Sequence, residues 1–339
     1  HERACVMIPS TAPHETEERA MLRASVRALV RRHAQAPAAW AGSRSDAVHD
    51  TVLWNHLQEQ IGGAAVAVPE QFGGGGGTID DTVIMLEELG AGLAPTPMLG
   101  TSLAAAAVDL CADEPSRARL LPRFAEGCTG TVGLECAAVV DIVGADVVLG
   151  VVDGRVLEFD AGSLTIRPLE SLDPTRALGT VDLAAAAGVD IGPAEQVTSI
   201  ASVLAAAEQV GAAGRCLERT VEYTSARVQF GRPIGSFQAL KHRMADLHVE
   251  VEAARALVHD ASASFHASGC DAGAVAAASV AASEALTAVA GEAVQMHGGI
   301  GVTWEHDVSW YFKRAHGSRY LFGTPSERMT RLVAVALAE

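Results

Sequence analysis

The segment RVQFGRPIGSFQ, residues 227–238, decides the fold assignment because it interrupts two long helical patterns with a short polar and aromatic stretch. Apolar residues recur at helical spacing over residues 196–225 before it and 238–267 after it. A third long helix is expected at 271–296, and a final one follows Pro325. The second half of the sequence therefore predicts a bundle of long helices.

Three side chains of this segment have the chemistry of a cofactor site. The guanidinium of Arg227 can pair with a pyrophosphate, the ring of Phe230 can cover a cofactor, and the amide of Gln238 can hydrogen-bond a polar edge. The simpler interpretation is an ordinary turn between helices that carries one surface arginine. A second motif favours the cofactor site.

That second motif is QMHGGIG, residues 295–301, at the end of the third predicted helix. Glycines lack Cβ, so they let the backbone approach a cofactor and allow positive φ where a helix ends. Gln295 adds an amide close to Gly298 and Gly299. A glycine cluster alone is weak evidence, but the two motifs together, inside one helical bundle, indicate a shared site.

The two motifs resemble the signatures of the acyl-CoA dehydrogenase family. In that family an R-x-x-F-G stretch, with a Gln eight residues after the Phe, and a Q-x-x-G-G-x-G stretch reach the FAD of a neighbouring subunit. The resemblance also covers residues 64–74, 86–90 and 120–122. It implies FAD as the cofactor and FAD-binding roles for the matching residues, which are Arg227, Phe230, Gln238, Gln295, Gly298 and Gly299.

The fold implied by this resemblance is mainly α with a small β domain. We expect an N-terminal helical domain at 1–130, a reduced middle β domain at 131–193 and a C-terminal helical bundle with the FAD-contacting motifs at 194–339. The change in composition near Thr129, where short runs of β-branched residues begin, supports the first boundary.

Two local signals are strong enough to test against a structure. Apolar residues at helical spacing predict an amphipathic helix over residues 16–33, with Thr16 in position to cap its start. Asp153-Gly154, between two runs of β-branched residues, predicts a hairpin turn with positive φ values. A further short strand is expected at 164–168.

The sequence departs from the family at the catalytic base. The family's reaction requires a carboxylate to remove an α-proton from an acyl-CoA thioester. In most members that Glu lies in a loop after the Q-x-x-G-G-x-G motif, and Phe322 occupies the matching position here. In other members it lies 29 residues before the signature Phe, where this sequence has Ala201. We therefore expect no catalytic residue at either position.

The middle region also departs from the family. Residues 133–190 are short, and they contain no match to the T-E-P-x-A-G-S-D and W-I-T-N stretches that hold a flavin ring within its own subunit. The sequence thus keeps the two motifs that contact the FAD of a neighbouring subunit. It lacks the stretches that would hold the chain's own flavin and the base that would act on its own substrate.

This division is similar to that in the actinobacterial heterotetrameric acyl-CoA dehydrogenases of steroid side-chain degradation. The resemblance implies a companion subunit in an α2β2 assembly, whose homologous partner carries the Glu base and whose substrate is an acyl-CoA.

Two other interpretations stay open. A self-sufficient homotetramer would need a displaced base, for which Glu195 and Glu305 are the candidates, although each is more typical of a solvated or helix-terminal charge. A non-enzymatic scaffold would use the fold for assembly alone, but it would have no evident need for Arg227 and Gln238.

Composition and residue spacing indicate which partners, which cellular setting and which metal sites to expect. The formal net charge of −16 opposes nucleic acid or an anionic membrane as the main partner. The alanine-rich apolar stretches contain Ser and Gly, so no membrane span is expected. Six cysteines without a C-x-x-C pair, and no signal peptide, favour a reduced cytoplasmic setting. No His or Cys spacing predicts a metal site.

Overall fold

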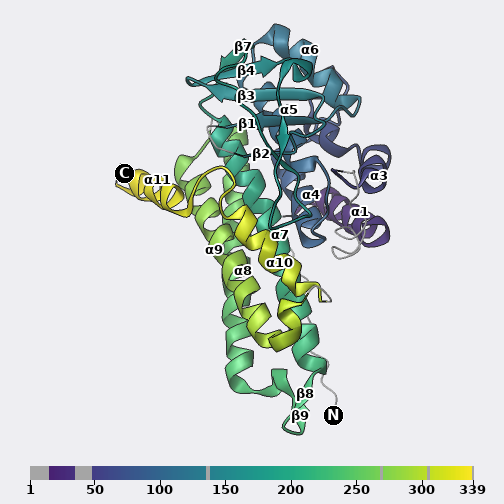
Figure 1. The fold of residues 1–339 in the computed structure, drawn as a ribbon, viewed down its shortest axis with the longest axis vertical. Coiled ribbons are helices and arrows are strands. Elements are labelled where there is room, and N and C mark those ends of the chain that lie inside the picture. The colour runs from purple at the N-terminus through teal and green to yellow at the C-terminus, as the bar shows by residue number, and fades with distance from the viewer. Residues whose placement is uncertain (1–14, 35–47, 135–137, 268–269, 304–305, 338–339) are drawn as a thin grey trace.

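The structure is a computed structural model that describes residues 15–34, 48–134, 138–267, 270–303 and 306–337. A long helical bundle carries, at one end, a group of shorter helices and a small sheet (Figure 1). At the other end the bundle finishes in a two-stranded hairpin. The predicted fold class, mainly α with a small β domain, is confirmed.

The first helix, α1 (Glu17–His33), begins where the sequence predicts. The side chain of Thr16 accepts a hydrogen bond from the backbone N–H of Arg19 at 3.3 Å and so caps the helix. Ion pairs fasten α1 to α4 (Ile79–Ala91), because Arg23 lies 2.5 Å from Glu87 and Arg27 lies 2.8 Å from Glu88.

Among the described residues, the remaining elements before the sheet are helical. They are α3 (Thr51–Ile61), the 3-10 helices η1 (Gly63–Ala67) and η2 (Glu70–Phe72), α5 (Met98–Cys111) and α6 (Glu114–Ala125). Asp50 caps α3, Asp113 caps α6, and Thr78 forms a capping box with Asp81 at the start of α4. Their apolar faces join one continuous core.

The middle region contains two small sheets. Strands β1 (Gly130–Gly133), β3 (Val147–Val152), β4 (Arg155–Phe159) and β7 (Gly188–Pro193) lie in the order β1-β3-β4-β7, with β1 parallel to β3 and the other pairs antiparallel. Strands β2 (Val139–Val140), β6 (Leu178–Thr180) and β5 (Arg167–Pro168) form the second sheet, with a 3-10 helix, η3 (Ala161–Ser163), before β5.

The predicted Asp153-Gly154 hairpin is confirmed. Val152 pairs with Arg155, and Asp153 and Gly154 have φ values of +49° and +73°. The strand expected at 164–168 is shorter than predicted, since only Arg167 and Pro168 pair with β6. Leu164 instead ends the 3-10 helix η3, where its backbone N–H donates to the carbonyl oxygen of Ala161 at 3.4 Å.

Four long or medium helices form the bundle: α7 (Val197–Ala226), α8 (Gln238–Ala267), α9 (Ala272–His297) and α10 (Val308–Ser318). A final helix, α11 (Pro325–Ala336), extends sideways from it (Figure 1). Glycine allows α4 and α7 to approach closely. A Cβ at Gly211 would lie 1.9 Å from the carbonyl oxygen of Glu87, and one at Gly90 would lie 2.2 Å from that of Glu208.

In the part of the chain that the structure describes, two helical stretches, Val197–Ala226 and Ala272–Val302, are long and apolar enough to cross a membrane by length and composition alone. In the structure 83% and 50% of their most apolar windows are buried inside the molecule. Their apolar residues include Leu204, Val210, Leu286 and Val289, all in the main core. Packing in a bundle core accounts for this composition.

Candidate functional site

The two sequence motifs meet at one end of the bundle. The first forms a hairpin of β8 (Val228–Gln229) and β9 (Arg232–Pro233), followed by the 3-10 helix η4 (Ile234–Ser236), between α7 and α8. The second ends α9 and forms the 3-10 helix η5 (Gly298–Val302). The ring of Tyr223, four residues before Arg227, stacks on the ring of His297 at a centroid distance of 4.2 Å. The tertiary structure therefore brings together the two predicted FAD elements.

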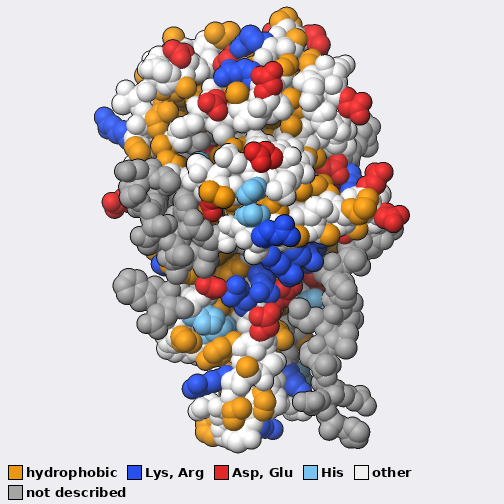
Figure 2. All heavy atoms as spheres, turned by 90° about the vertical axis from the view of Figure 1, so that its right-hand side faces the viewer, with side chains coloured by type: hydrophobic (Ala, Val, Ile, Leu, Met, Phe, Trp, Pro, Cys, Tyr) orange, Lys and Arg blue, Asp and Glu red, His pale blue; other side chains and the backbone are white. Residues whose placement is uncertain are grey.

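Phe230 occupies the tip of the hairpin in an unusual conformation. Its φ is +54°, next to Gly231 at +76°, and its side chain is 92% exposed. Positive φ at an aromatic residue costs about 1–3 kcal/mol, and such strain is concentrated at functional sites. Figure 2 shows hydrophobic side chains exposed at this tip, where Val228 is also 54% exposed.

Arg227, Gln238 and Gln295 are also exposed. Within the described residues, the guanidinium of Arg227 forms no ion pair, so its charge is available to a partner outside the chain. By contrast, Arg243 on α8 is paired with Glu292 at 2.7 Å. A planar cation with five donors can bind a phosphate oxygen pair bidentately.

The glycines of the second motif have different surroundings. Gly298 has a φ of +64°, and a Cβ built on Gly298 or Gly299 would meet no atom within 4 Å. A Cβ on Gly301 would lie 2.8 Å from the carbonyl oxygen of Val294. Packing inside the chain therefore explains Gly301 but not Gly299, whose bare backbone is open to close approach from outside.

A cluster of rings that sequence reasoning missed holds this end of the bundle together. His297 is 4% exposed, and its ring stacks on the ring of Tyr223. The ring of His306 lies at a centroid distance of 4.5 Å from that of His297, tilted by 56°. The Nδ1 of His297 lies 2.7 Å from the carbonyl oxygen of Ala293, and burial lowers the pKa of the imidazole. A neutral ring with Nδ1–H as donor fits this contact.

Further contacts join the same cluster to the neighbouring helices. The Tyr223 hydroxyl donates to the carbonyl oxygen of His297 at 3.4 Å, and Arg219 pairs with Asp307 at 2.7 Å. The only sequence signal for Tyr223 is its position one helical turn before Arg227, on the same face of α7.

The two base positions lie at the opposite end of α7 from these motifs. Helix α10 runs antiparallel to α7, because Asp307 at its start meets Arg219 whereas Ser318 at its end accepts a hydrogen bond from Gln209 at 3.1 Å. Ala201 precedes Arg227 by 26 residues along α7, which corresponds to about 40 Å of helix.

The side chains at both base positions are buried. Ala201 is fully buried, and Phe322, which follows α10, is 6% exposed with a φ of +58°. The carbonyl oxygen of Leu321 accepts a hydrogen bond from Arg328 at 2.5 Å, which fixes the Phe322 loop on α11. Of the alternative bases, Glu195 is exposed just before α7, and Glu305 lies outside the described residues.

The buried carboxylates near this end belong to an ion-pair network that the sequence did not reveal. Arg314 pairs with Asp173 and, at 2.9 Å, with Glu208, while Arg176 also pairs with Glu208. All four side chains are at most 8% exposed. The network joins the loop before β6 to α7 and α10, and its paired carboxylates cannot serve as a free base.

Asp141 lies beside this network and has an altered proton affinity. It is 3% exposed and accepts a hydrogen bond from the backbone N–H of Gly100 at 3.0 Å. Burial raises the pKa of its carboxyl to about 7, against the opposing field of Arg176.

We expect Asp141→Asn to flatten the pH dependence of stability. The folded chain holds this proton up to about pH 7, whereas an unfolded chain releases it near pH 4. The contribution of Asp141 is thus fully present below about pH 4 and falls by up to about 1.4 kcal/mol per pH unit until pH 7. Asparagine carries no charge, can accept from Gly100, and tolerates the φ of +56°.

Urea unfolding midpoints at pH 5, 6, 7 and 8 measure this effect, and the variant should be the more stable protein at pH 8. The matched control is Asp153→Asn, which also has positive φ but lies in the exposed hairpin turn. An unchanged pH slope in Asp141→Asn would show that the carboxyl is already ionised in the folded protein.

Within the described residues, no group of three or more His, Cys, Asp or Glu side chains could hold a metal ion. The exposed arginine, the exposed aromatic ring and the open glycine backbone at the bundle tip instead fit one side of a large anionic cofactor.

Comparisons with known proteins agree with this geometry. The acyl-CoA dehydrogenase C-terminal domain matches residues 196–338, and the acyl-CoA dehydrogenase N-terminal domain matches residues 16–128. The acyl-CoA dehydrogenase IpdE2 of Mycolicibacterium smegmatis is 47% identical over 321 residues, which cover 94% of this chain and 99% of that protein. IpdE2 of Mycobacterium tuberculosis is 46% identical over 93% of this chain and 96% of that protein.

Two solved structures share the fold along almost the whole chain. The Tcur3481-Tcur3483 steroid ACAD G363A variant has a TM-score of 0.86 at 28% identity, covering 95% of this chain and 98% of that one. The ChsE4-ChsE5 complex from Mycobacterium tuberculosis has a TM-score of 0.85 at 26% identity, covering 98% and 99%. With nearly half of its residues identical to IpdE2 along almost its full length, the chain belongs to the acyl-CoA dehydrogenase family, whose members are FAD-dependent flavoproteins.

Proposed function

We propose that this chain is the companion subunit of a heteromeric acyl-CoA dehydrogenase and completes the FAD site of a homologous partner that carries the Glu base. The observation that carries the proposal is that neither base position holds a carboxylate, since Ala201 is fully buried and Phe322 is 6% exposed. Ala201 lies about 40 Å from Arg227 along α7, so this base position and the FAD motifs of the same chain do not reach one flavin. In an α2β2 assembly, the homologous partner would supply the carboxylate base that this chain lacks.

Each exposed residue at the bundle tip has a role in this proposal. Arg227 binds the pyrophosphate, Phe230 covers the cofactor, and Gln238 and Gln295 hydrogen-bond its polar edges. Gly298 and Gly299 let the backbone of the second motif approach the cofactor. When bound, FAD supplies the hydride acceptor for α,β-dehydrogenation of an acyl-CoA thioester.

Two further observations support the heteromeric assignment. Residues 138–193 form strands of two to six residues, two of them with only two, and the sequence there has no match to the stretches that hold a flavin ring within its own subunit. Both of the structural relatives above are named as pairs of different proteins, and one is described as a steroid ACAD. We therefore propose a bulky, steroid-derived acyl-CoA as substrate and the cytoplasm as the location.

The decisive test is to purify the chain alone and together with a homologous Glu-bearing subunit. Alone it should bind little FAD and show no turnover, whereas the co-expressed complex should contain flavin and oxidise acyl-CoA thioesters. Thioesters of increasing bulk then define the substrate class. Stoichiometric flavin and turnover by the chain alone would contradict the proposal. In that case Glu195→Gln and Glu305→Gln would identify a displaced base.

We expect the Tyr223 ring to affect the affinity of the complex for FAD, because its stack on His297 holds the two FAD motifs in position. Tyr223→Ala removes the stack on His297 and should weaken FAD binding by about tenfold, because an aromatic pair contributes about 0.5–1.5 kcal/mol beyond its buried area. Tyr223→Phe keeps the ring and should stay within about twofold of the wild type.

Titration of the flavin-free complex with FAD measures both variants. If Tyr223→Phe lost as much affinity as Tyr223→Ala, the hydroxyl contact to His297 rather than the ring would be responsible.

A further inference from the structure

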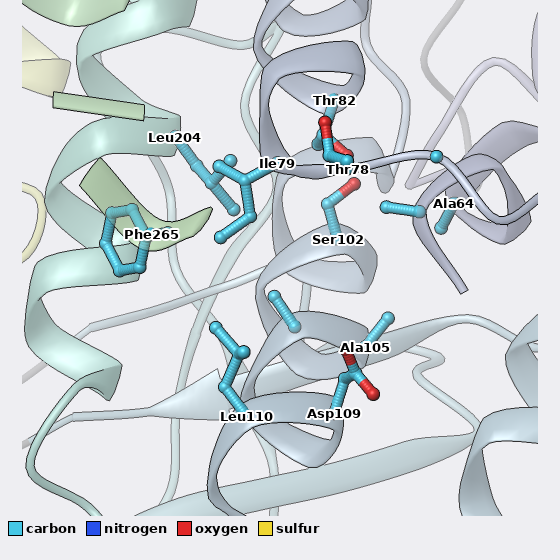
Figure 3. Close-up of a pocket in the computed structure, with 13 residues that line it drawn as sticks. Ala64, Thr78, Ile79, Thr82, Ser102, Ala105, Asp109, Leu110, Leu204 and Phe265 are labelled. Carbon is cyan, nitrogen blue, oxygen red and sulfur yellow. The ribbon is translucent and has the colours of Figure 1, made fainter. Parts of the chain in front are cut away.

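A cavity of about 140 Å³ lies between the N-terminal helices and the bundle, away from the residues proposed to act on FAD. Its walls include Ile79 and Thr82 of α4, Ser102 and Ala105 of α5, Leu204 of α7 and Phe265 of α8 (Figure 3). Neither base position lines it, and neither does any residue of the two FAD motifs.

The two ends of the cavity differ in polarity and exposure. The hydroxyls of Ser102 and Thr82 lie at one end in Figure 3, and these residues are 5% and 4% exposed. Asp109 and Leu110 lie at the other end, where Leu110 is 41% exposed. The cavity therefore approaches solvent near Leu110, and two buried hydroxyls lie at its other end, beside the partly exposed Thr78.

Ser102 provides the strongest sign of an occupant. Its Oγ is buried and has no hydrogen-bond partner, whereas the neighbouring Thr101 accepts a hydrogen bond from the backbone N–H of Gly130 at 3.1 Å. Leaving a buried hydroxyl unpaired costs about 1–3 kcal/mol. A ligand oxygen at this end would accept from Ser102 and remove that cost.

The other walls exclude a charged ligand. Between the two ends the surface is formed by Ile79, Leu204, Phe265 and small alanine side chains. The one carboxylate among the lining residues, Asp109, is already paired with Arg117 at 2.7 Å, so it has little need of a further cation. None of the lining residues is a lysine or arginine that could pair with an anion. The volume is close to the roughly 150 Å³ of cavities that hold one benzene ring.

We propose that this cavity is a binding site for a small neutral molecule with a body the size of one six-membered ring and a single carbonyl or hydroxyl oxygen. The oxygen meets Ser102 and the ring lies against Leu204 and Ile79. Because the walls come from both the N-terminal helices and the bundle, binding there stabilises the junction between them.

Cyclohexanone is the probe, with cyclohexanecarboxylate as the charged control of the same ring size. Ligand-observed NMR with the full chain, alone and in the co-expressed complex, should give a Kd on the order of 1 mM for the ketone. The carboxylate should not bind. No ketone binding at tens of millimolar would show that the cavity holds water only and would overturn the proposal.

Two kinds of variant test the position of the probe. Ser102→Ala should weaken cyclohexanone binding by about fivefold, since a neutral hydrogen bond contributes about 1 kcal/mol, whereas the exposed Ser326→Ala on α11 should have no effect. Ala105→Leu fills the cavity and should abolish binding. If Ala105→Leu fails to fold, Ala106→Leu replaces it as the variant that fills the cavity. Ala106 lines the cavity at a partly exposed position, so the larger side chain causes less strain there. Undiminished binding in a folded filling variant, or in Ser102→Ala, would contradict the site.

Discussion

Replacing Arg227 with alanine in the assembled complex is expected to weaken FAD binding by about 100-fold. Charge-assisted hydrogen bonds contribute about 1.5–3 kcal/mol each, and a bidentate guanidinium makes two of them to a phosphate. Because the guanidinium is exposed and forms no ion pair within the described residues, its loss leaves no unpaired charge inside the chain. The stability of the subunit should therefore change little while the flavin is lost.

FAD titration and the flavin content of the purified complex measure this prediction. Arg227→Lys keeps the charge but not the planar fork, and it should give an intermediate affinity. The matched control is Arg243→Ala, which removes an arginine whose charge Glu292 already neutralises at 2.7 Å. Full flavin retention in Arg227→Ala would favour the scaffold interpretation instead.

Arg314→Met should destabilise the folded chain by about 3–5 kcal/mol, the range expected when one partner of a buried ion pair is removed. Arg314 is 2% exposed and donates to Glu208 at 2.9 Å and to the hydroxyl of Thr175 at 2.7 Å, besides pairing with Asp173. The substitution keeps an apolar stem but leaves both carboxylates without this cation in a dry environment.

Denaturant unfolding of the chain, with and without the partner, measures the loss. Arg155→Met is the control, because its ion pair with Asp190 has a similar geometry at 2.8 Å but leaves both side chains 48% exposed. Solvent screens that pair, so the control should change stability little. A loss in Arg314→Met no larger than that of the control would show that water reaches the network.

Some features could be predicted because they depend on neighbours in sequence. The cap at Thr16 and the turn at Asp153-Gly154 need only the residues within three or four positions. The helices flanking residues 227–238 follow from apolar periodicity, which reports the buried face of a helix whatever packs against it. The family assignment likewise came from two short motifs and is confirmed by the comparisons.

The length of a strand was less predictable than its existence. Residues 164–168 have the composition of a strand, but pairing with β6 ends at Arg167 and Pro168. Composition indicates which residues suit a sheet, whereas the available partner decides how many of them pair.

The sequence by itself determined the fold class, the two motifs with their chemistry, and the absence of a carboxylate at Phe322 and Ala201. Only the tertiary structure decided that Tyr223 and His297 join those motifs at one end of the bundle. It also decided that the side chains at the two base positions are buried at the other end. It also decided that Arg314 meets residues 106 and 141 positions away. The reason is physical: helix periodicity and turn chemistry act over a few residues, whereas burial and ion pairing depend on which distant surfaces the packed helices bring together.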